Sequence, residues 1–259
     1  MFIKKFLKYK KKPKPTELER LQAYPTQVVG YTDILGPRFK FHDSLSFLVT
    51  YKEIFKDEIY RFPSGIGRHT ILDCGANMGL STIFFAINYP QHHIIAFEPQ
   101  EDIYEVLKEN VMSFGLQNVE LIKAAVWTKH DILKFFTDGT MGGRVNNSYK
   151  GQIPKLIQAL PLIDFLSEDV EFLKLDIEGA EDEVLRACIG KLDYVKYLFF
   201  EYHNKVATRQ HLHELLELVA KAGFTYFIKE SAVRQRPYME DPIICESFDM
   251  ALNVFCYKR

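Results

Sequence analysis

The segment Thr70–Pro99, TILDCGANMGLSTIFFAINYPQHHIIAFEP, predicts a strand, a glycine turn, a helix and a second strand that ends at an acidic residue. Its first five residues, Thr70–Cys74, are mostly apolar. The helix is indicated by apolar residues that recur at i, i+3, i+4 and i+7, namely Leu80, Ile83, Phe84 and Ile87. A β-α-β unit with a glycine turn after its first strand is typical of nucleotide-binding α/β sheets.

The glycine turn and the acid at the end of the second strand together predict a ligand. Gly75 and Gly79 lack a Cβ atom, so the backbone can turn sharply and approach a ligand closely. The helix N-terminus that follows offers unpaired N–H groups to a carboxylate or phosphate. Glu98 stands where an acid accepts hydrogen bonds from ribose hydroxyls. We therefore expect an adenine nucleoside with an anionic tail, either a dinucleotide such as NAD or S-adenosylmethionine.

The spacing within the turn favours S-adenosylmethionine. A dinucleotide fold requires G-x-G-x-x-G, but Ala76 and Asn77 occupy the middle of this turn. The heptapeptide Asp73–Gly79, DCGANMG, instead resembles motif I of the class I methyltransferases. An NAD-dependent oxidoreductase remains the alternative, and a binding module that keeps the fold without catalysis is a third interpretation.

Composition indicates one large α/β domain with additions. The chain has 259 residues, of which 47% are hydrophobic, enough for a full core. Its net charge of −1 conceals a basic arm, because residues 1–14 carry seven lysines and no acid. The body that remains is acidic, which argues against a nucleic-acid substrate bound over a wide surface.

The N-terminal arm, residues 1–15, is expected to be flexible. An alternative interpretation attaches it to an anionic membrane surface, with Phe2 and Phe6 entering the interface and lysines adding attraction. No apolar run approaches the ~20 residues of a membrane-spanning helix, and the arm lacks the apolar core of a signal peptide. The four cysteines form no C-x-x-C pair and are expected to be reduced. We predict a cytoplasmic protein, with peripheral membrane contact as the alternative.

Outside the quoted segment, the pattern predicts a cap over residues 16–66 and a cofactor-binding domain over residues 67–259. The cap is expected to be small and β-rich, since the pattern from Gln27 to Val49 is strand-like, with Phe39 and Phe41 and then Phe47 and Val49 two residues apart. In the domain, strands and helices alternate, which implies a mostly parallel sheet. Its further strands are predicted at residues 119–123, 172–176, 195–200, 224–228 and 251–257, the last two as an antiparallel hairpin, and an extra strand is expected at residues 132–136.

Three linked motifs resemble the FkbM-type family of S-adenosylmethionine-dependent methyltransferases. They are Asp73–Gly79, Phe97–Pro99 and, most specifically, KLDIEGAE within Leu173–Glu181, while Ser46–Phe55 resembles the segment ahead of the family's core. The resemblance covers about residues 45–230. It implies a class I Rossmann-like fold, with a seven-stranded, mostly parallel sheet and helices on both faces. It also implies methylation of a hydroxyl oxygen on a sugar, a glycan or a small metabolite.

The resemblance assigns the glycine turn to the methionine part of the cofactor. Gly75, Asn77 and Gly79 would cradle that part, and Asp73 would support the turn. Two neighbours complete this group of cofactor-binding residues, Ala76 and Ser81.

The ends of the other strands are expected to bind the rest of the cofactor. Glu98, followed by Pro99, would hold the ribose, and Ala125 would border the adenine. Asp176 would lie beside the amino group and the sulfonium. Ligands of open α/β sheets bind outside the carboxyl ends of the strands, which agrees with this placement.

A sugar hydroxyl is a weak nucleophile and needs a base, for which His203, Glu201 and Asp176 are the candidates. Histidine titrates closest to neutrality, so His203 is favoured on its intrinsic pKa. Each candidate also has a structural interpretation: His203 as a surface histidine, Glu201 as a salt-bridged acid and Asp176 as a helix cap. Glu178 and Glu181 are expected to be capping or packing acids. No spacing typical of metal ligands is present, so no metal is predicted. The identity of the acceptor and the oligomeric state are left open.

Overall fold

The computed structural model describes residues 15–137, 143–145, 154–206, 208–231, 236, 238–240 and 248–258. The N-terminal arm predicted at residues 1–15 lies outside the described residues except for Pro15, so its flexibility and its membrane contact stay predictions. No helix in the described part of the chain is both long and apolar enough to cross a membrane. Cys74, Cys188 and Cys256 are buried and free, as expected of reduced thiols.

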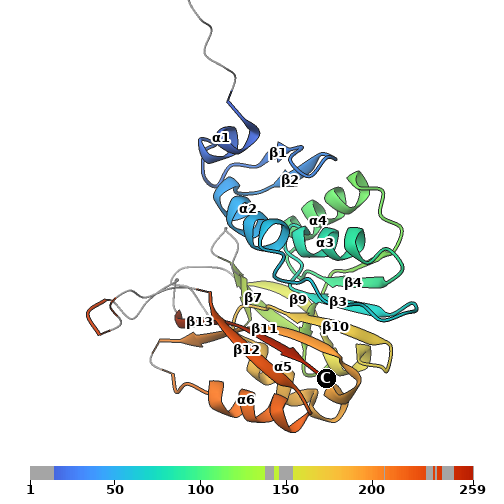
Figure 1. Cartoon of the computed structure of the whole chain (residues 1–259). Coiled ribbons are helices and arrows are strands. Elements are labelled where there is room, and N and C mark those ends of the chain that lie inside the picture. Colours follow the sequence, from blue (N-terminus) through green and yellow to red (C-terminus); the bar gives the residue numbers. More distant parts are fainter. Residues whose placement is uncertain are drawn as a thin grey trace, which may run out of the picture.

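The centre of the molecule is a seven-stranded sheet (Figure 1) with the order β12-β13-β11-β10-β3-β4-β5. Its neighbouring strands are parallel except around β13, which runs antiparallel to both β11 and β12. The strands are β3 (Thr70–Cys74), β4 (His93–Phe97), β5 (Val119–Ile122), β10 (Val170–Leu175), β11 (Tyr197–Lys205), β12 (Thr225–Glu230) and β13 (Phe248–Tyr257). This confirms the predicted sheet, including the antiparallel pair at its end.

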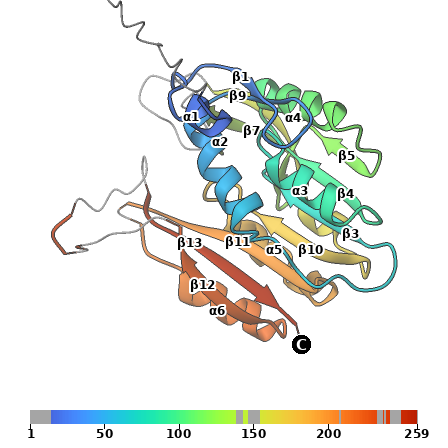
Figure 2. The ribbon, with the colours of Figure 1, turned by 45° about the horizontal axis from the view of Figure 1, so that its top comes forward.

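Helices cover both faces of the sheet (Figures 1 and 2). On one face lie α3 (Leu80–Asn88) and α4 (Glu101–Ser113), and on the other lie α5 (Glu181–Ala187) and α6 (Leu212–Lys221). Two short 3₁₀ turns flank the second group, at Leu162–Phe165 and Ile189–Tyr194. Helix α3 is buried along most of its length, because it lies between the sheet and the N-terminal cap. A helix that is covered on two sides needs apolar side chains around most of its circumference, which explains the apolar sequence of α3.

The cap is mostly helical, contrary to the β-rich cap that the alternation predicts. It consists of α1 (Glu17–Gln22), β1 (Gly30–Thr32), β2 (Phe39–Phe41), α2 (Ser44–Tyr51) and a π-helical turn at Lys52–Lys56. Phe47 and Val49, predicted in a strand, lie in α2. The helix begins here because the Asp43 carboxylate accepts the Ser46 N–H at 2.8 Å. Phe47 and Tyr51 then stack one turn apart, with ring centroids 5.7 Å from each other.

The cap and the domain share one hydrophobic core. Cap residues Phe47 and Ile54 belong to the same buried cluster as Phe84 of α3. Asn110 of α4 adds a polar link, which we call the Asn110 bridge: its amide exchanges hydrogen bonds of 2.7 and 2.9 Å with the Lys40 backbone in β2. The same amide donates to the Met78 carbonyl of the glycine turn at 2.8 Å. The cap is therefore fixed directly to the turn.

A second sheet is inserted between β5 and β10, where the sequence predicts only one strand. It has the order β6-β9-β7-β8, with β6 (Ala125–Trp127), β7 (Asp131–Thr137), β8 (Gly143–Val145) and β9 (Lys155–Pro161). Ala125, Leu133 and Phe135 belong to its buried cluster. This sheet brings Ala125 and Phe135 to the edge of the cavity described next.

Candidate active site

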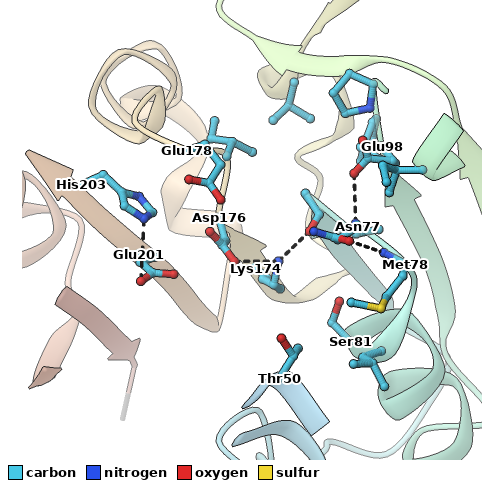
Figure 3. A pocket seen from close by; sticks show the side chains of 18 of the residues that line it. Thr50, Asn77, Met78, Ser81, Glu98, Lys174, Asp176, Glu178, Glu201 and His203 are labelled. Atoms are coloured by element: carbon cyan, nitrogen blue, oxygen red, sulfur yellow. Dashed lines mark hydrogen bonds and ion pairs between the residues drawn. The ribbon is translucent and has the colours of Figure 1, made fainter. Parts of the chain in front are cut away.

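A cavity of about 370 Å³ opens at the carboxyl ends of β3, β4, β10 and β11, beneath α2 of the cap (Figure 3). Its position is the one that ligands take in open α/β sheets. All but two of the cofactor and catalytic residues predicted from sequence line it, namely Gly75, Ala76, Asn77, Ser81, Glu98, Pro99, Ala125, Asp176, Glu201 and His203.

The two glycines of the turn are required by contacts within the protein. Gly75 and Gly79 have φ angles of +83° and +98°, which side chains disfavour. A Cβ atom on Gly75 would lie 1.8 Å from the Asp176 carbonyl oxygen, and one on Gly79 would lie 2.7 Å from a Leu107 methyl carbon. From the sequence, both glycines are expected to allow the close approach of a ligand. In the structure, the Asp176 carbonyl and the Leu107 side chain already occupy the space where a Cβ atom would stand.

Asp73 and Gly79 are the two predicted residues that do not line the cavity. Asp73 is fully buried, because its Oδ2 accepts hydrogen bonds from Ser81 Oγ at 2.7 Å and Thr82 Oγ1 at 2.6 Å. Its carboxylate holds the first turn of α3 against the end of β3. Gly79 lies behind the wall, against α4. Both residues support the turn from behind the cavity.

Glu98 combines burial with two main-chain hydrogen bonds. Its Oε2 accepts the Asn77 N–H at 3.0 Å and its Oε1 accepts the Gln100 N–H at 2.9 Å. Each oxygen keeps a lone pair for another donor. Burial raises the pKa of Glu98 to about 7, although both N–H groups oppose the shift. The geometry suits a ligand that brings two hydroxyl donors, such as a ribose.

Beyond Glu98 the cavity wall is apolar. Phe97, Pro99, Ile103, Ala125 and Phe135 form this part of the lining. Flat aromatic ligands are bound by such surfaces. An adenine ring fits here, next to the carboxylate that suits its ribose.

Lys174, to which the sequence analysis gave no role, ties two strand ends together under the cavity. It is 2% exposed, and its Nζ lies 3.5 Å from both Asp73 Oδ1 and Asp176 Oδ2. The same ammonium donates to the Gly75 carbonyl at 3.0 Å. Burial lowers the pKa of Lys174, but Asp176 and Asp73 outweigh it and the net shift is upward. A lysine inside the apolar strand 170–175 was the signal that could have revealed it.

His203 is held between two carboxylates at the end of β11. Its Nδ1 lies 3.3 Å from Glu181 Oε1, and its Nε2 lies 3.7 Å from Glu201 Oε1. Burial lowers the pKa of His203, but Glu181, Glu201 and Glu178 outweigh it and raise the pKa well above the ordinary value. The flanking carboxylates therefore favour the protonated, imidazolium form of the ring. The intrinsic-pKa argument for His203 as the base does not apply in this environment.

Glu181, the first residue of α5, holds the turn that precedes the helix and does not cap the helix itself. Its carboxylate accepts N–H groups from Ile177 at 2.8 Å and Gly179 at 2.9 Å. Ligand atoms of Asp176, Glu181 and His203 lie within 4.8 Å of one another, a spacing that a metal ion can use. As arranged, however, Glu181 is committed to the turn and His203 is protonated. This group does not fit a metal ion well.

Two carboxylates on the same side of the cavity titrate near neutrality. Burial raises the pKa of Glu178 to about 8, with Asp176 adding to the shift and His203 opposing it. Burial and Asp176 raise the pKa of Glu201 to about 7. Glu201 also accepts a short hydrogen bond from Ser231 Oγ. Carboxyl groups with such pKa values exchange protons readily at pH 7.

The comparison with known families identifies the domain. The family model described as "Methyltransferase FkbM domain" matches residues 73–226, more than half of the chain. The chain belongs to the FkbM methyltransferase family. The FkbM domain therefore takes S-adenosylmethionine as its cofactor, which decides between the two adenine nucleosides that the sequence left open.

Individual relatives of this FkbM domain are distant. Methyltransferase sdnD of Sordaria araneosa is 26% identical over 172 residues, which are 52% of this chain and 66% of that protein. Methyltransferase 1 of Beauveria bassiana is 29% identical over 161 residues, 52% of this chain and 65% of that protein. The chain thus spans about two thirds of the length of these relatives. A solved S-adenosylmethionine-dependent methyltransferase from Agrobacterium tumefaciens has a similar fold, with a TM-score of 0.50 and 11% identity over 92% of this chain and 72% of that one.

The cap adds residues to the cavity that lie outside the matched FkbM span. Thr50 of α2, Glu53 of the π-helical turn and Tyr60 all line it, and Figure 3 shows Thr50 across the cavity from Asp176 and Lys174. π-Helical turns often occur at functional sites. Sequence reasoning missed these residues because nothing in their local pattern indicates which cavity they face.

Proposed function

We propose that this protein transfers a methyl group from S-adenosylmethionine to a hydroxyl oxygen of a sugar, a glycan or a small metabolite. One observation supports a hydroxyl group as the methyl acceptor, which family membership alone does not specify. A carboxylate whose pKa is raised to about 7, Glu201, lines the same cavity as the ribose-binding candidate Glu98. A hydroxyl acceptor needs a base of this kind, because its own pKa is far above neutrality.

The residues present fit the cofactor. When bound, S-adenosylmethionine supplies a methyl group already activated by its sulfonium. Glu98 would hold the ribose hydroxyls, and the apolar wall around Ala125 would hold the adenine. Asp176, whose Oδ2 lies 3.5 Å from Lys174 Nζ, would attract the cationic end.

On the acceptor side, Glu201 would remove the hydroxyl proton and His203 would act as a positioning residue. Glu181 fixes the His203 ring from one side at 3.3 Å, and the charged ring in turn lies 3.7 Å from Glu201. This arrangement favours the ionised form of Glu201. Asp176 stays the third candidate for the base, although its carboxylate is already engaged by the Lys174 ammonium.

The first experiment is a parallel calorimetric titration with S-adenosylmethionine, S-adenosylhomocysteine and NAD. We expect micromolar binding of the first two compounds and none of NAD. A panel of hydroxylated acceptors should then be screened for methyl transfer. Binding of NAD alone would overturn the proposal. Binding of both sulfur compounds without transfer to any acceptor would favour a module that binds the cofactor without catalysis.

A further inference from the structure

The acceptor side of the cavity gathers more buried carboxyl groups than it has cations to pair with them. Glu53, Asp176, Glu178 and Glu201 all line it, and His203 is the imidazolium among them. The other cation in the described lining is the Lys174 ammonium. It is already shared between Asp176 and Asp73, which lies behind the wall. Like charges gathered in a poorly solvated space raise one another's free energy. A cationic ligand would relieve this repulsion.

The Glu53 carboxylate extends this charge to the roof of the cavity. Burial raises the pKa of Glu53, and Asp176 adds to the shift across the cavity. The exposed Lys229 of β12 opposes it from outside. The Glu53 main-chain carbonyl accepts the Ile59 N–H, but its carboxylate makes no ion pair or hydrogen bond with the residues that the structure describes. Its carboxylate is therefore available to a ligand.

Tyr60 provides a second, independent indication of a ligand. The residue is 4% exposed and lines the cavity. Within the described ranges its hydroxyl has no hydrogen-bond partner. Burial raises the pKa of Tyr60, and Asp176, Glu201 and Glu53 add to the shift, so the hydroxyl faces the acidic group. The hydroxyl oxygen is not among the enclosed, unpaired polar atoms of the described residues and so is accessible from the cavity, where a polar group of the acceptor can pair with it.

A metal ion does not satisfy these observations. The metal-like trio of Asp176, Glu181 and His203 has its glutamate bound to a main-chain turn and its histidine protonated. Glu53 and Tyr60 belong to the opposite wall and are not among the three. An organic cation with hydroxyl groups can contact both walls at once.

We propose that the methyl acceptor is an aminated polyol, such as an amino sugar or amino alcohol, whose ammonium group is bound by Glu53, Asp176 and Glu178. This inference rests on the methyltransferase function proposed above and names its substrate class. The Tyr60 hydroxyl would bond a further polar group of the acceptor. The hydroxyl to be methylated would face Glu201. Phosphorylated or carboxylated acceptors would be repelled.

Recognition of an ammonium group should strengthen as the pH rises from 6 to 7, an interval in which amino sugars and amino alcohols stay mostly protonated. Over that interval Glu201 and, to a smaller extent, Glu178 lose protons, since their pKa values are raised to about 7 and about 8. A protonated carboxyl group does not attract a cation, so acidic conditions weaken binding. Other charged groups face Glu178 and Glu201 from each neighbouring element. The cap contributes Glu53, β12 contributes Lys229, and the strand ends contribute Glu98, Lys174 and Asp176. Helix α5 contributes Glu181, and β11 contributes His203.

The test compares amines with their own acetamides. Protein saturated with S-adenosylhomocysteine is titrated with glucosamine, galactosamine and ethanolamine, and with the N-acetyl form of each. We expect at least one amine to bind tenfold or more tightly than its acetamide at pH 7, where all three amines are mostly protonated, with a smaller ratio at pH 6. Glu53→Gln and Glu178→Gln should each reduce the ratio at least threefold. Glu183→Gln, at an exposed glutamate of the nearby α5, is the matched control and should leave it unchanged.

Failure of this inference is distinguishable from failure of the proposed function. If S-adenosylhomocysteine does not bind, the methyltransferase function itself is contradicted. If S-adenosylhomocysteine binds but no amine has a higher affinity than its acetamide, the proposed substrate class is wrong. The same holds if the affinity ratio is unchanged in both Glu53→Gln and Glu178→Gln. Titration with MnCl₂ alone tests the metal alternative. Tight binding of Mn²⁺ that is lost in His203→Ala would also overturn the proposal.

Discussion

The two sides of the cavity are held together in opposite ways. On the cofactor side, Glu98 and the glycine turn are joined by main-chain hydrogen bonds, and Asp73 Oδ2 accepts two hydroxyl groups of α3. On the acceptor side, Glu53, Glu178 and Glu201 meet as side chains from separate elements with too little opposite charge between them. The first arrangement is complete before any ligand arrives, while the second is completed by one. The difference teaches that the cofactor site is part of the fold and that the acceptor site is an electrostatic addition to it.

The largest expected effect is on the side that belongs to the fold. Gly75→Ala should lower the free energy of unfolding by about 3–5 kcal/mol, since it combines a positive φ with a severe clash. Gly115→Ala is the matched control, because Gly115 also has a positive φ but open space around it. It should cost only about 1 kcal/mol. Urea unfolding of both variants measures the difference, and equal losses would contradict the role given to the Asp176 carbonyl.

On the acceptor side, a substitution should spare the fold and affect catalysis. Glu201→Gln removes the proposed base and should lower turnover about 100-fold. The affinity for S-adenosylhomocysteine should stay within about twofold, because Glu201 lies on the other side of the cavity. Initial rates on an acceptor from the screen, together with calorimetry, give both values. Full activity would return the role of base to Asp176 or His203.

Glu98 combines two roles: its carboxylate accepts main-chain hydrogen bonds within the fold, and it is the proposed contact of the ribose. Glu98→Gln should weaken binding of S-adenosylhomocysteine about tenfold, since charged hydrogen bonds are worth about 1.5–3 kcal/mol and the amide retains part of them. Glu101→Gln, at an exposed position of α4 paired only with Lys123, serves as the control. Unchanged affinity in the Glu98 variant would remove Glu98 from the ribose site.

The smallest effect is a pH dependence of cofactor affinity. The pKa of Glu98 is raised to about 7 in the free protein, and bound hydroxyl donors would lower it again. Binding therefore requires the ionised form and weakens as the pH falls through 7. Affinity for S-adenosylhomocysteine should be about threefold lower at pH 6.5 than at pH 7.5, from the ionised fractions. The dependence should flatten in Glu98→Gln; a slope that persists there would belong to another group.

The same contrast explains what could be predicted from sequence. The strands, α3 and the positions of Gly75 and Glu98 follow from local periodicity and a short motif, which the fold obeys. The protonation of His203 could not be predicted, because it depends on Glu181, which is far away in sequence and near only after folding. Glu53 and Tyr60 carried no signal for the same reason. The cap was predicted to be β-rich because alternating Phe39 and Phe41 precede a helix whose start depends on a single cap, Asp43.

The Asn110 bridge has a consequence for how this molecule opens. One buried amide holds both the β2 backbone and the Met78 carbonyl, so lifting the cap removes hydrogen bonds that orient the side chain holding the glycine turn. The two segments form one unit of local unfolding, and the Lys40 amide hydrogen should exchange with solvent no faster than those of the turn. A homologous cap grafted onto this domain would need the same backbone contact with Asn110. Cap and cofactor turn would then be inherited together, as a single exchangeable module.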